Sequence, residues 1–204
     1  MGNTTAKIIS VVFHPLLMTT YVFMGLVLGM PLKLNFSPEL SLKFISMVGV
    51  TTFFIPMTGI LVLKVTRTIS KLEMDDRRER FFPFLFITLF YIATTYLFYD
   101  RFRFPPVIIN ILIGVSSSLI VLTAITLYWK ISAHAIAAAG AVGIFLALLD
   151  GSESDTMKWV LITFLLITGI VASSRLKLNA HSSSQVWVAI LIGFSLNFIL
   201  LLLL

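Results

Sequence analysis

Long blocks of apolar residues recur along this chain and constrain its fold more than any other feature. A helix needs about 20 such residues to cross roughly 30 Å of hydrocarbon. The chain has 204 residues, of which 58% are hydrophobic and 12% are charged, whereas about a quarter of the residues of a soluble domain are charged. The sequence therefore predicts an all-α integral membrane protein: a polytopic bundle of six to seven transmembrane helices in a single domain, 1–204.

Seven apolar segments separated by polar joints are expected to form these helices. They are residues 8–30, 40–63, 81–99, 106–129, 135–149, 157–172 and 186–204. Pro15 and Pro56 predict a kink or a late helix start in the first two segments, because proline lacks an amide proton and disturbs the preceding turn. The fifth segment is rich in alanine and glycine, which permits close contact with a neighbouring helix.

Seven spans would place the two chain termini on opposite sides of the membrane. The N-terminus would then share its side with the charge run 64–80 and the joints 130–134 and 173–185. Most of the 15 lysines and arginines fall on this side, which the positive-inside tendency would make cytoplasmic. An anion-binding site would need the same cations, so the sequence leaves the orientation open.

Several classes of function are disfavoured by composition. There is no cysteine, so neither disulfides nor thiolate chemistry can be expected. The net charge of +6 fits topology and anionic lipid better than nucleic acid, and no nucleic-acid partner is predicted. His134 and His181 are too few for a zinc site, and there is no Walker-type loop, so we expect no metal and no other cofactor.

Three polar stretches on the predicted common side carry side chains suited to a phosphate. In the joint 173–185, Arg175 precedes His181, and Gln185 follows it. A fixed cation can hold an oxyanion while an imidazole acts as nucleophile or acid. Ser132 and His134 stand at the start of the fifth segment, where helix amides favour anions. The charge run contributes three further candidates, which are Lys71, Arg78 and Arg80.

These stretches resemble the signature of the type 2 phosphatidic acid phosphatases, the membrane relatives of vanadium haloperoxidases. That signature reads Lys-x6-Arg-Pro, then Pro-Ser-Gly-His, then Ser-Arg-x5-His-x3-Asp. The third block matches best, from Ser174 and Arg175 to His181, with Gln185 in place of the aspartate. This block and the order of the other two carry the resemblance, which covers residues 64–190.

The first two blocks match in part. Ser132 and His134 fit the second block, with alanine in place of its glycine and isoleucine in place of its proline. Lys71 and Arg78 have the spacing of the first block, although glutamate follows in place of proline. A second register of that block uses Arg80 as its arginine, and the sequence does not decide between the two.

The resemblance implies a lipid phosphate or pyrophosphate phosphatase with a phosphohistidine intermediate, in a prokaryotic cytoplasmic membrane. His181 would attack phosphorus, His134 would protonate the leaving group, and Gln185 would orient His181 through its other ring nitrogen. The equatorial oxygens would be held by Arg175, Lys71 and either Arg78 or Arg80, with Ser132 assisting. The partners implied are a lipid phosphate and the bilayer; the sequence does not indicate an oligomeric state.

Each stretch also has a purely structural interpretation. Arg175 would close the sixth helix as an interface cation, Ser132 would cap the fifth, and the charge run would be a solvated helix end. His14 in the first segment is interpreted as a packed or interfacial residue. Because Gln185 is uncharged, the alternative function is a catalytically impaired relative that binds anionic lipid or supports another membrane protein.

Overall fold

The protein is helical throughout the residues described by the computed structural model, which are 1–30, 34–71, 74, 76–149 and 154–204. The α-helices are α1 (Asn3–Val12), α2 (Pro15–Gly29), α4 (Pro38–Gly49), α5 (Ile55–Val65), α6 (Phe81–Asp100), α7 (Pro106–Thr126), α8 (Ala133–Leu149), α9 (Asp155–Lys177) and α10 (Ser183–Leu203). A π-helical turn, η1 (Val50–Phe54), joins α4 to α5, and a 3-10 turn, η2 (Arg77–Glu79), precedes α6. The all-α prediction is confirmed.

The lengths of the helices confirm a polytopic membrane bundle. Five helical stretches of the described chain are long and apolar enough to cross a membrane, or six if the bent pair α1 and α2 counts as one span. Each of the seven predicted segments corresponds to a helix or a broken helix. One helix, α8, is shorter than a full membrane span: its 17 residues extend about 25 Å at 1.5 Å per residue, compared with roughly 30 Å of hydrocarbon.

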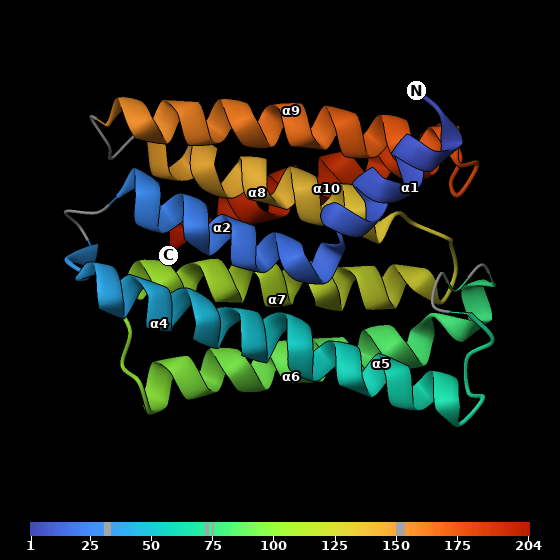
Figure 1. Ribbon diagram of the computed structural model, residues 1–204, viewed down its shortest axis with the longest axis horizontal. Coiled ribbons are helices and arrows are strands. Elements are labelled where there is room, and N and C mark those ends of the chain that lie inside the picture. The colour runs from blue at the N-terminus through green and yellow to red at the C-terminus, as the bar shows by residue number, and fades with distance from the viewer. Residues whose placement is uncertain (31–33, 72–73, 75, 150–153) are drawn as a thin grey trace.

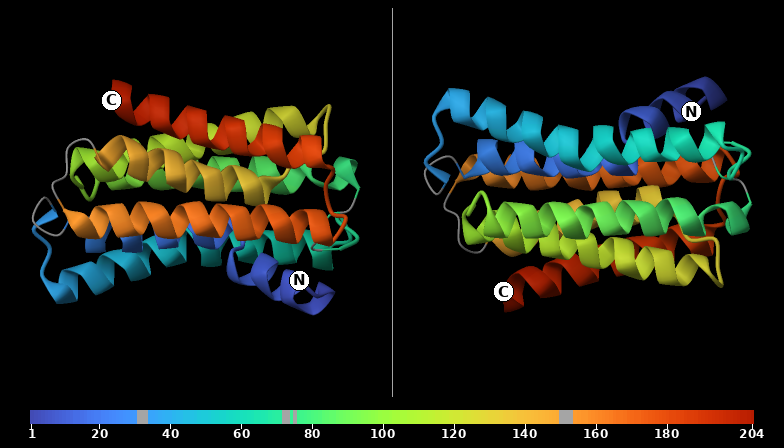
Figure 2. Two further views of the ribbon diagram at one scale, coloured as in Figure 1. Left: turned by 90° about the horizontal axis from the view of Figure 1, so that it is seen from above. Right: turned by 90° about the horizontal axis from the view of Figure 1, so that it is seen from below.

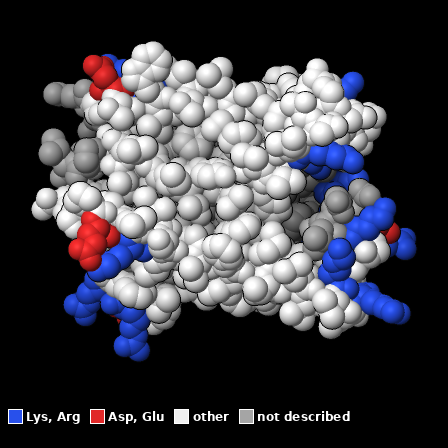
Figure 3. Space-filling view, in the orientation of Figure 1, with Lys and Arg blue, Asp and Glu red and all other residues white. Residues whose placement is uncertain are grey.

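The helices lie nearly parallel in one bundle, from which α1 leans away (Figures 1 and 2). The N-terminus, the described parts of the connection between α5 and α6 (66–71 and 76–80) and the connections 127–132 and 178–182 lie at one end, on the right in Figure 1. The connection 101–105 and the C-terminus lie at the other. On the face seen in Figure 3, Lys and Arg gather at these two ends and leave an uncharged belt between them. The three predicted polar stretches therefore share one end.

Both prolines predicted to disturb helices do so. Pro15 is the first residue of α2, which follows α1 after a bend of 60°. His14 is the N-cap of α2, and its Nδ1 accepts the Leu16 amide N–H at 3.3 Å. Pro56 lies in the first turn of α5, directly after η1. A proline removes one helical hydrogen bond, and the wider π-turn relieves the resulting clash.

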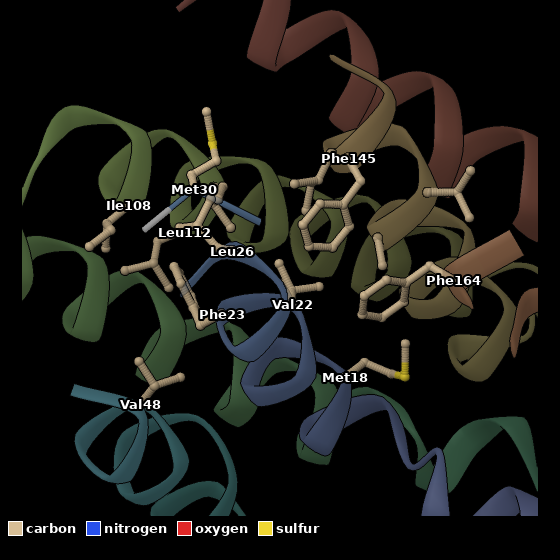
Figure 4. Close-up of a cluster of buried hydrophobic side chains, with 14 of the residues drawn as sticks. Met18, Val22, Phe23, Leu26, Met30, Val48, Ile108, Leu112, Phe145 and Phe164 are labelled. Carbon is tan, nitrogen blue, oxygen red and sulfur yellow. The ribbon is translucent and has the colours of Figure 1, made fainter. Parts of the chain in front are cut away.

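The half of the bundle away from the N-terminus is filled by a hydrophobic core (Figure 4). Its largest buried members come from α2, α4, α6, α7 and α8, and include Phe23, Phe44, Phe98, Ile108, Leu112 and Phe145. In the other half, α8 packs closely on α10. A Cβ at Gly193 would collide with the Ile136 carbonyl, so only glycine permits this approach. The predicted close contact of the small-residue segment is confirmed.

Candidate functional site

A cavity of about 420 Å³ lies in the half of the bundle near the N-terminus. Its volume is within the range of roughly 300–1,000 Å³ that small-ligand sites occupy. All three histidines of the chain line it: His14, His134 and His181. Arg80 and Arg175 line it as well. Four separate segments of sequence thus bring imidazoles and guanidinium groups to one place, which is the central observation about this site.

The connection between α9 and α10 positions His181. At the end of α9, Asn179 adopts a left-handed conformation with φ 51°, and Ala180 N–H donates to the Arg175 carbonyl at 3.2 Å. Together with the Asn179 N–H bond to Leu176 O, this is a Schellman cap. At the start of α10, Ser182 and Gln185 form a capping box. His181 is fixed between two capped helix ends.

The hydrogen bonds of His181 define its tautomer. Its Nδ1 lies 3.2 Å from both the Lys130 carbonyl and Gln185 Oε1. Gln185 Oε1 also accepts the Ser182 amide N–H at 3.1 Å, so this atom must be the oxygen of the side-chain amide. Because both neighbours of Nδ1 are acceptors, Nδ1 carries the proton and Nε2 keeps its lone pair. Nε2 is the nitrogen a nucleophile requires.

The environment of His181 keeps the imidazole neutral. The side chain is 8% exposed. Burial, followed by the charges of Arg80 and Arg175, lowers the pKa of His181 from 6.5 to about 4. At neutral pH the ring is therefore unprotonated at Nε2, which is the form that can attack phosphorus.

Two guanidinium groups give the cavity its positive charge. Arg80 is 5% exposed; its Nε donates to Met74 O at 2.7 Å and its Nη1 to Ile131 O at 3.4 Å. Arg175 lies in the last turn of α9, and its Nη1 donates to Ser10 Oγ at 3.1 Å. Two such cations at one cavity favour an anionic ligand.

His134 is tied to α1. Its Nε2 lies 3.0 Å from the Ser10 carbonyl, which accepts its proton. Ser10 Oγ is also 3.4 Å from Ser174 Oγ, in addition to its bond with Arg175. Ser10 is 8% exposed and links the ends of α1, α8 and α9 at the cavity wall. Its role was not predicted, because no local sequence pattern distinguishes a serine on an amphipathic helix.

The remaining predicted residues lie outside the cavity lining. Gln185 contacts the site through His181. Ser132 is fully buried, and its hydroxyl accepts the Ala135 amide N–H at 3.4 Å as the cap of α8. Lys71 and Arg78 are exposed at the bundle surface. Among the arginines proposed for the first block, Arg80 is the one that the structure brings to the cavity.

His14 belongs to the site although the sequence interpretation made it a packing residue. Its ring meets that of His134 edge to face, with centroids 5.7 Å apart. The signal in the sequence was the pair His14 and Pro15, since a proline at the first helical position makes the preceding residue an N-cap.

Away from the basic end, the cavity continues between apolar side chains. These include Leu16, Met18, Val22, Ile87, Leu122, Ile136 and Ile144. A few polar groups interrupt them: Tyr91 donates to the Thr52 carbonyl, and Asn197 donates to Ser118 Oγ. The cavity therefore combines a charged end with apolar walls, as an amphiphilic ligand would require.

Within the described residues, no three His, Asp or Glu side chains are grouped as a metal site would require. Comparison with known proteins gives no match to a family model, to a curated protein or to a solved structure. The fold and the site therefore define the protein only by class, as a polytopic membrane protein with a basic, histidine-lined cavity.

Proposed function

We propose that the protein is a membrane phosphatase for lipid phosphates or pyrophosphates, and that its reaction proceeds through a phosphohistidine on His181. The observation that carries this proposal is the tautomer of His181, with Nδ1 held by two oxygens and Nε2 left as a neutral lone pair. The resemblance of the joint 173–185 to the type 2 phosphatidic acid phosphatases agrees with this role. A prokaryotic cytoplasmic membrane remains the predicted location.

The reaction has two displacements at phosphorus. First, His181 Nε2 forms a bond to phosphorus while the bond to the lipid oxygen breaks, with Arg80 and Arg175 neutralising the phosphoryl oxygens. The lipid oxygen takes a proton from Nδ1 of a doubly protonated His134, whose Nε2–H stays bound to the Ser10 carbonyl. Water then attacks the phosphohistidine, the P–N bond breaks, and the proton of the water returns to His134. The sum is lipid phosphate plus water giving lipid alcohol plus inorganic phosphate.

The substrate class follows from the shape of the cavity. A phosphate or pyrophosphate at the basic end would leave its hydrocarbon chain against the apolar walls. The apolar walls can pack against a hydrocarbon chain, which a water-soluble phosphate ester lacks, so a long-chain phosphate should bind better. Phosphatidic acid, polyprenyl pyrophosphate and phosphatidylglycerol phosphate all meet this description.

A second function is favoured by one residue. Gln185 orients His181 but carries no charge, so it stabilises the imidazolium-like transition state less than an aspartate would. Loss of the comparable carboxylate in serine proteases lowers kcat by about 10⁴. The alternative proposal is a catalytically impaired relative that binds anionic lipid, or that supports another membrane protein, through the same cavity.

The test is phosphate release by the purified protein in detergent micelles. The panel contains the three lipid phosphates and glycerol phosphate as the soluble control, with His181→Ala as the control variant. The enzyme proposal expects release from at least one lipid, weaker release from glycerol phosphate, and none from the variant. Equal release by wild type and His181→Ala across the panel refutes it, whereas binding without release supports the alternative.

A further inference from the structure

We propose that His14 is a phosphate-binding residue of the cavity and donates a hydrogen bond from Nε2 to a phosphoryl oxygen. The inference rests on the proposed phosphate chemistry of this site. It adds to that chemistry the bend between α1 and α2, which lies outside every stretch that resembles a phosphatase signature.

The cap of α2 decides which nitrogen of His14 carries the proton. Nδ1 accepts the amide N–H of Leu16, and a ring nitrogen that accepts a hydrogen bond has no proton of its own. Neutral His14 therefore carries its proton on Nε2. A proton on Nδ1 would point at the Leu16 amide N–H, which is also a donor, and the hydrogen bond would be lost. The cap therefore favours the neutral ring. His14 is thus an uncharged N–H donor and unsuited to act as an acid.

The position of His14 makes this donor available to a ligand. The residue lines the cavity, and its ring lies edge to face against His134. Ser10, one helical turn earlier, already holds His134 and Arg175 by hydrogen bonds. Within the described chain, the side-chain hydrogen bonds of His14 involve Nδ1, so its Nε2–H is left to bond a ligand.

The charge of the cavity favours a neutral donor at this place. Arg80 and Arg175 already supply two positive charges, and a third cation beside them would be repelled and would need further desolvation. A phosphoryl group has several oxygens and accepts many hydrogen bonds. A neutral N–H contributes a directed bond without adding to the repulsion. His14 therefore supplements the two guanidinium groups.

The experiment measures the dissociation constant of inorganic phosphate from the full-length protein by isothermal titration calorimetry. In His14→Ser the hydroxyl still caps α2 but is too short to replace the imidazole. We expect the dissociation constant to rise about 10-fold or more, as for the loss of a hydrogen bond to a charged group, while the melting temperature stays close to that of wild type.

A matched control separates the cap from the ligand contact. Ser37 caps α4 at the opposite end of the bundle by accepting the Leu40 amide N–H. His14→Ala and Ser37→Ala each lose one cap, so both should melt earlier. We expect only His14→Ala to bind phosphate more weakly. In histidine ¹⁵N spectra of wild type, phosphate should shift an Nε2 resonance that is absent from His14→Ser.

The outcomes distinguish this inference from the proposed reaction. Equal dissociation constants for wild type and His14→Ser, or no phosphate binding by wild type, overturn the role of His14. Phosphate binding that depends on His14 without hydrolysis of any lipid phosphate retains this inference and refutes the enzyme proposal. If His181→Ala abolishes hydrolysis but His14→Ser binds phosphate as tightly as wild type, the enzyme proposal is supported and the role of His14 is refuted.

Discussion

The two ends of the bundle hold their charges in different ways. Among the described residues at the end remote from the N-terminus, three ion pairs join residues close in sequence: Lys43 with Glu39, Arg101 with Asp100, and Lys158 with Asp155. Their side chains are 44% to 84% exposed. At the other end, Arg80 is 5% exposed and His181 8%. Exposed pairs contribute little to stability, whereas buried ionisable groups gathered at a cavity are a mark of a binding or catalytic site.

Packing differs between the same two halves. The remote half is filled by phenylalanines and branched residues (Figure 4). The half near the N-terminus has its own cluster of buried apolar residues but also encloses the cavity. Close packing stabilises the fold, and a cavity gives up some of that stabilisation. The comparison indicates that the remote half contributes mainly to stability and the half near the N-terminus mainly to function.

The largest effect is expected from the two guanidinium groups that line the cavity. Arg80→Met and Arg175→Met should each lower kcat/KM for phosphate release by about 10²–10³, the usual effect of removing a group that stabilises transition-state charge. Lys43→Met and Arg101→Met remove exposed cations at the remote end and should leave kcat/KM unchanged. Steady-state kinetics on the four variants checks this. If kcat/KM fell equally in the variants of both ends, the two ends would not differ in function.

A carboxylate in place of Gln185 should strengthen the site. Gln185→Glu keeps the length of the side chain and the capping box with Ser182, and it places a charge beside His181 Nδ1. Turnover should rise about 10-fold or more, given the large effect of such a carboxylate elsewhere. Gln185→Asp is one methylene shorter and should gain less. An unchanged kcat in Gln185→Glu would show that residue 185 does not limit the reaction.

The buried histidine should titrate in acid. With a pKa of about 4, His181 should stay neutral through pH 5–6, where an exposed histidine is protonated. NMR titration of the imidazole, assigned with His181→Ala, measures this pKa directly. A midpoint near 6.5 would contradict the burial of the site.

The lowered pKa of His181 also makes the stability of the fold depend on pH. As pH falls from 6.5 to about 4, the unfolded chain binds a proton at residue 181 that the folded protein does not. The free energy of unfolding therefore decreases over this interval, and His181→Ala should show a smaller decrease. Urea unfolding of both proteins at several pH values checks the sign.

The smallest effect is expected at Ser132. If its hydroxyl acts as the cap of α8, Ser132→Ala should lower the free energy of unfolding by about 1 kcal/mol and leave kcat/KM for phosphate release unchanged. Thermal unfolding and steady-state kinetics give both quantities. A loss of activity with unchanged stability would assign Ser132 to phosphate binding instead.

Local patterns predicted most of the fold. Pro15 marked the bend between α1 and α2, and Pro56 marked the π-turn between α4 and α5, because proline acts on its own turn. Apolar blocks marked the other helices. The joint 173–185 was also informative, since Arg175, His181 and Gln185 belong to two consecutive helix caps. The length of α8 was less apparent, because its start depends on where the chain from α7 turns.

The contacts between distant segments could not be predicted. Ser10 reaches His134 and Arg175 only because the chain bends by 60° between α1 and α2, and no spacing in the sequence encodes that angle. His14 joins the cavity for the same reason. In the charge run, Lys71, Arg78 and Arg80 all had suitable spacing, and burial of one of them was decided by the turn that precedes α6.

The most direct test of the central claim is to trap the phosphorylated protein. Wild type is mixed with the ³²P-labelled lipid phosphate that it hydrolyses fastest, quenched in alkali to preserve a P–N bond, and digested for mass spectrometry. The proposed mechanism predicts label on His181 at Nε2 and none in His181→Ala. Phosphate release by wild type without label on His181, or with label on another residue, would contradict it.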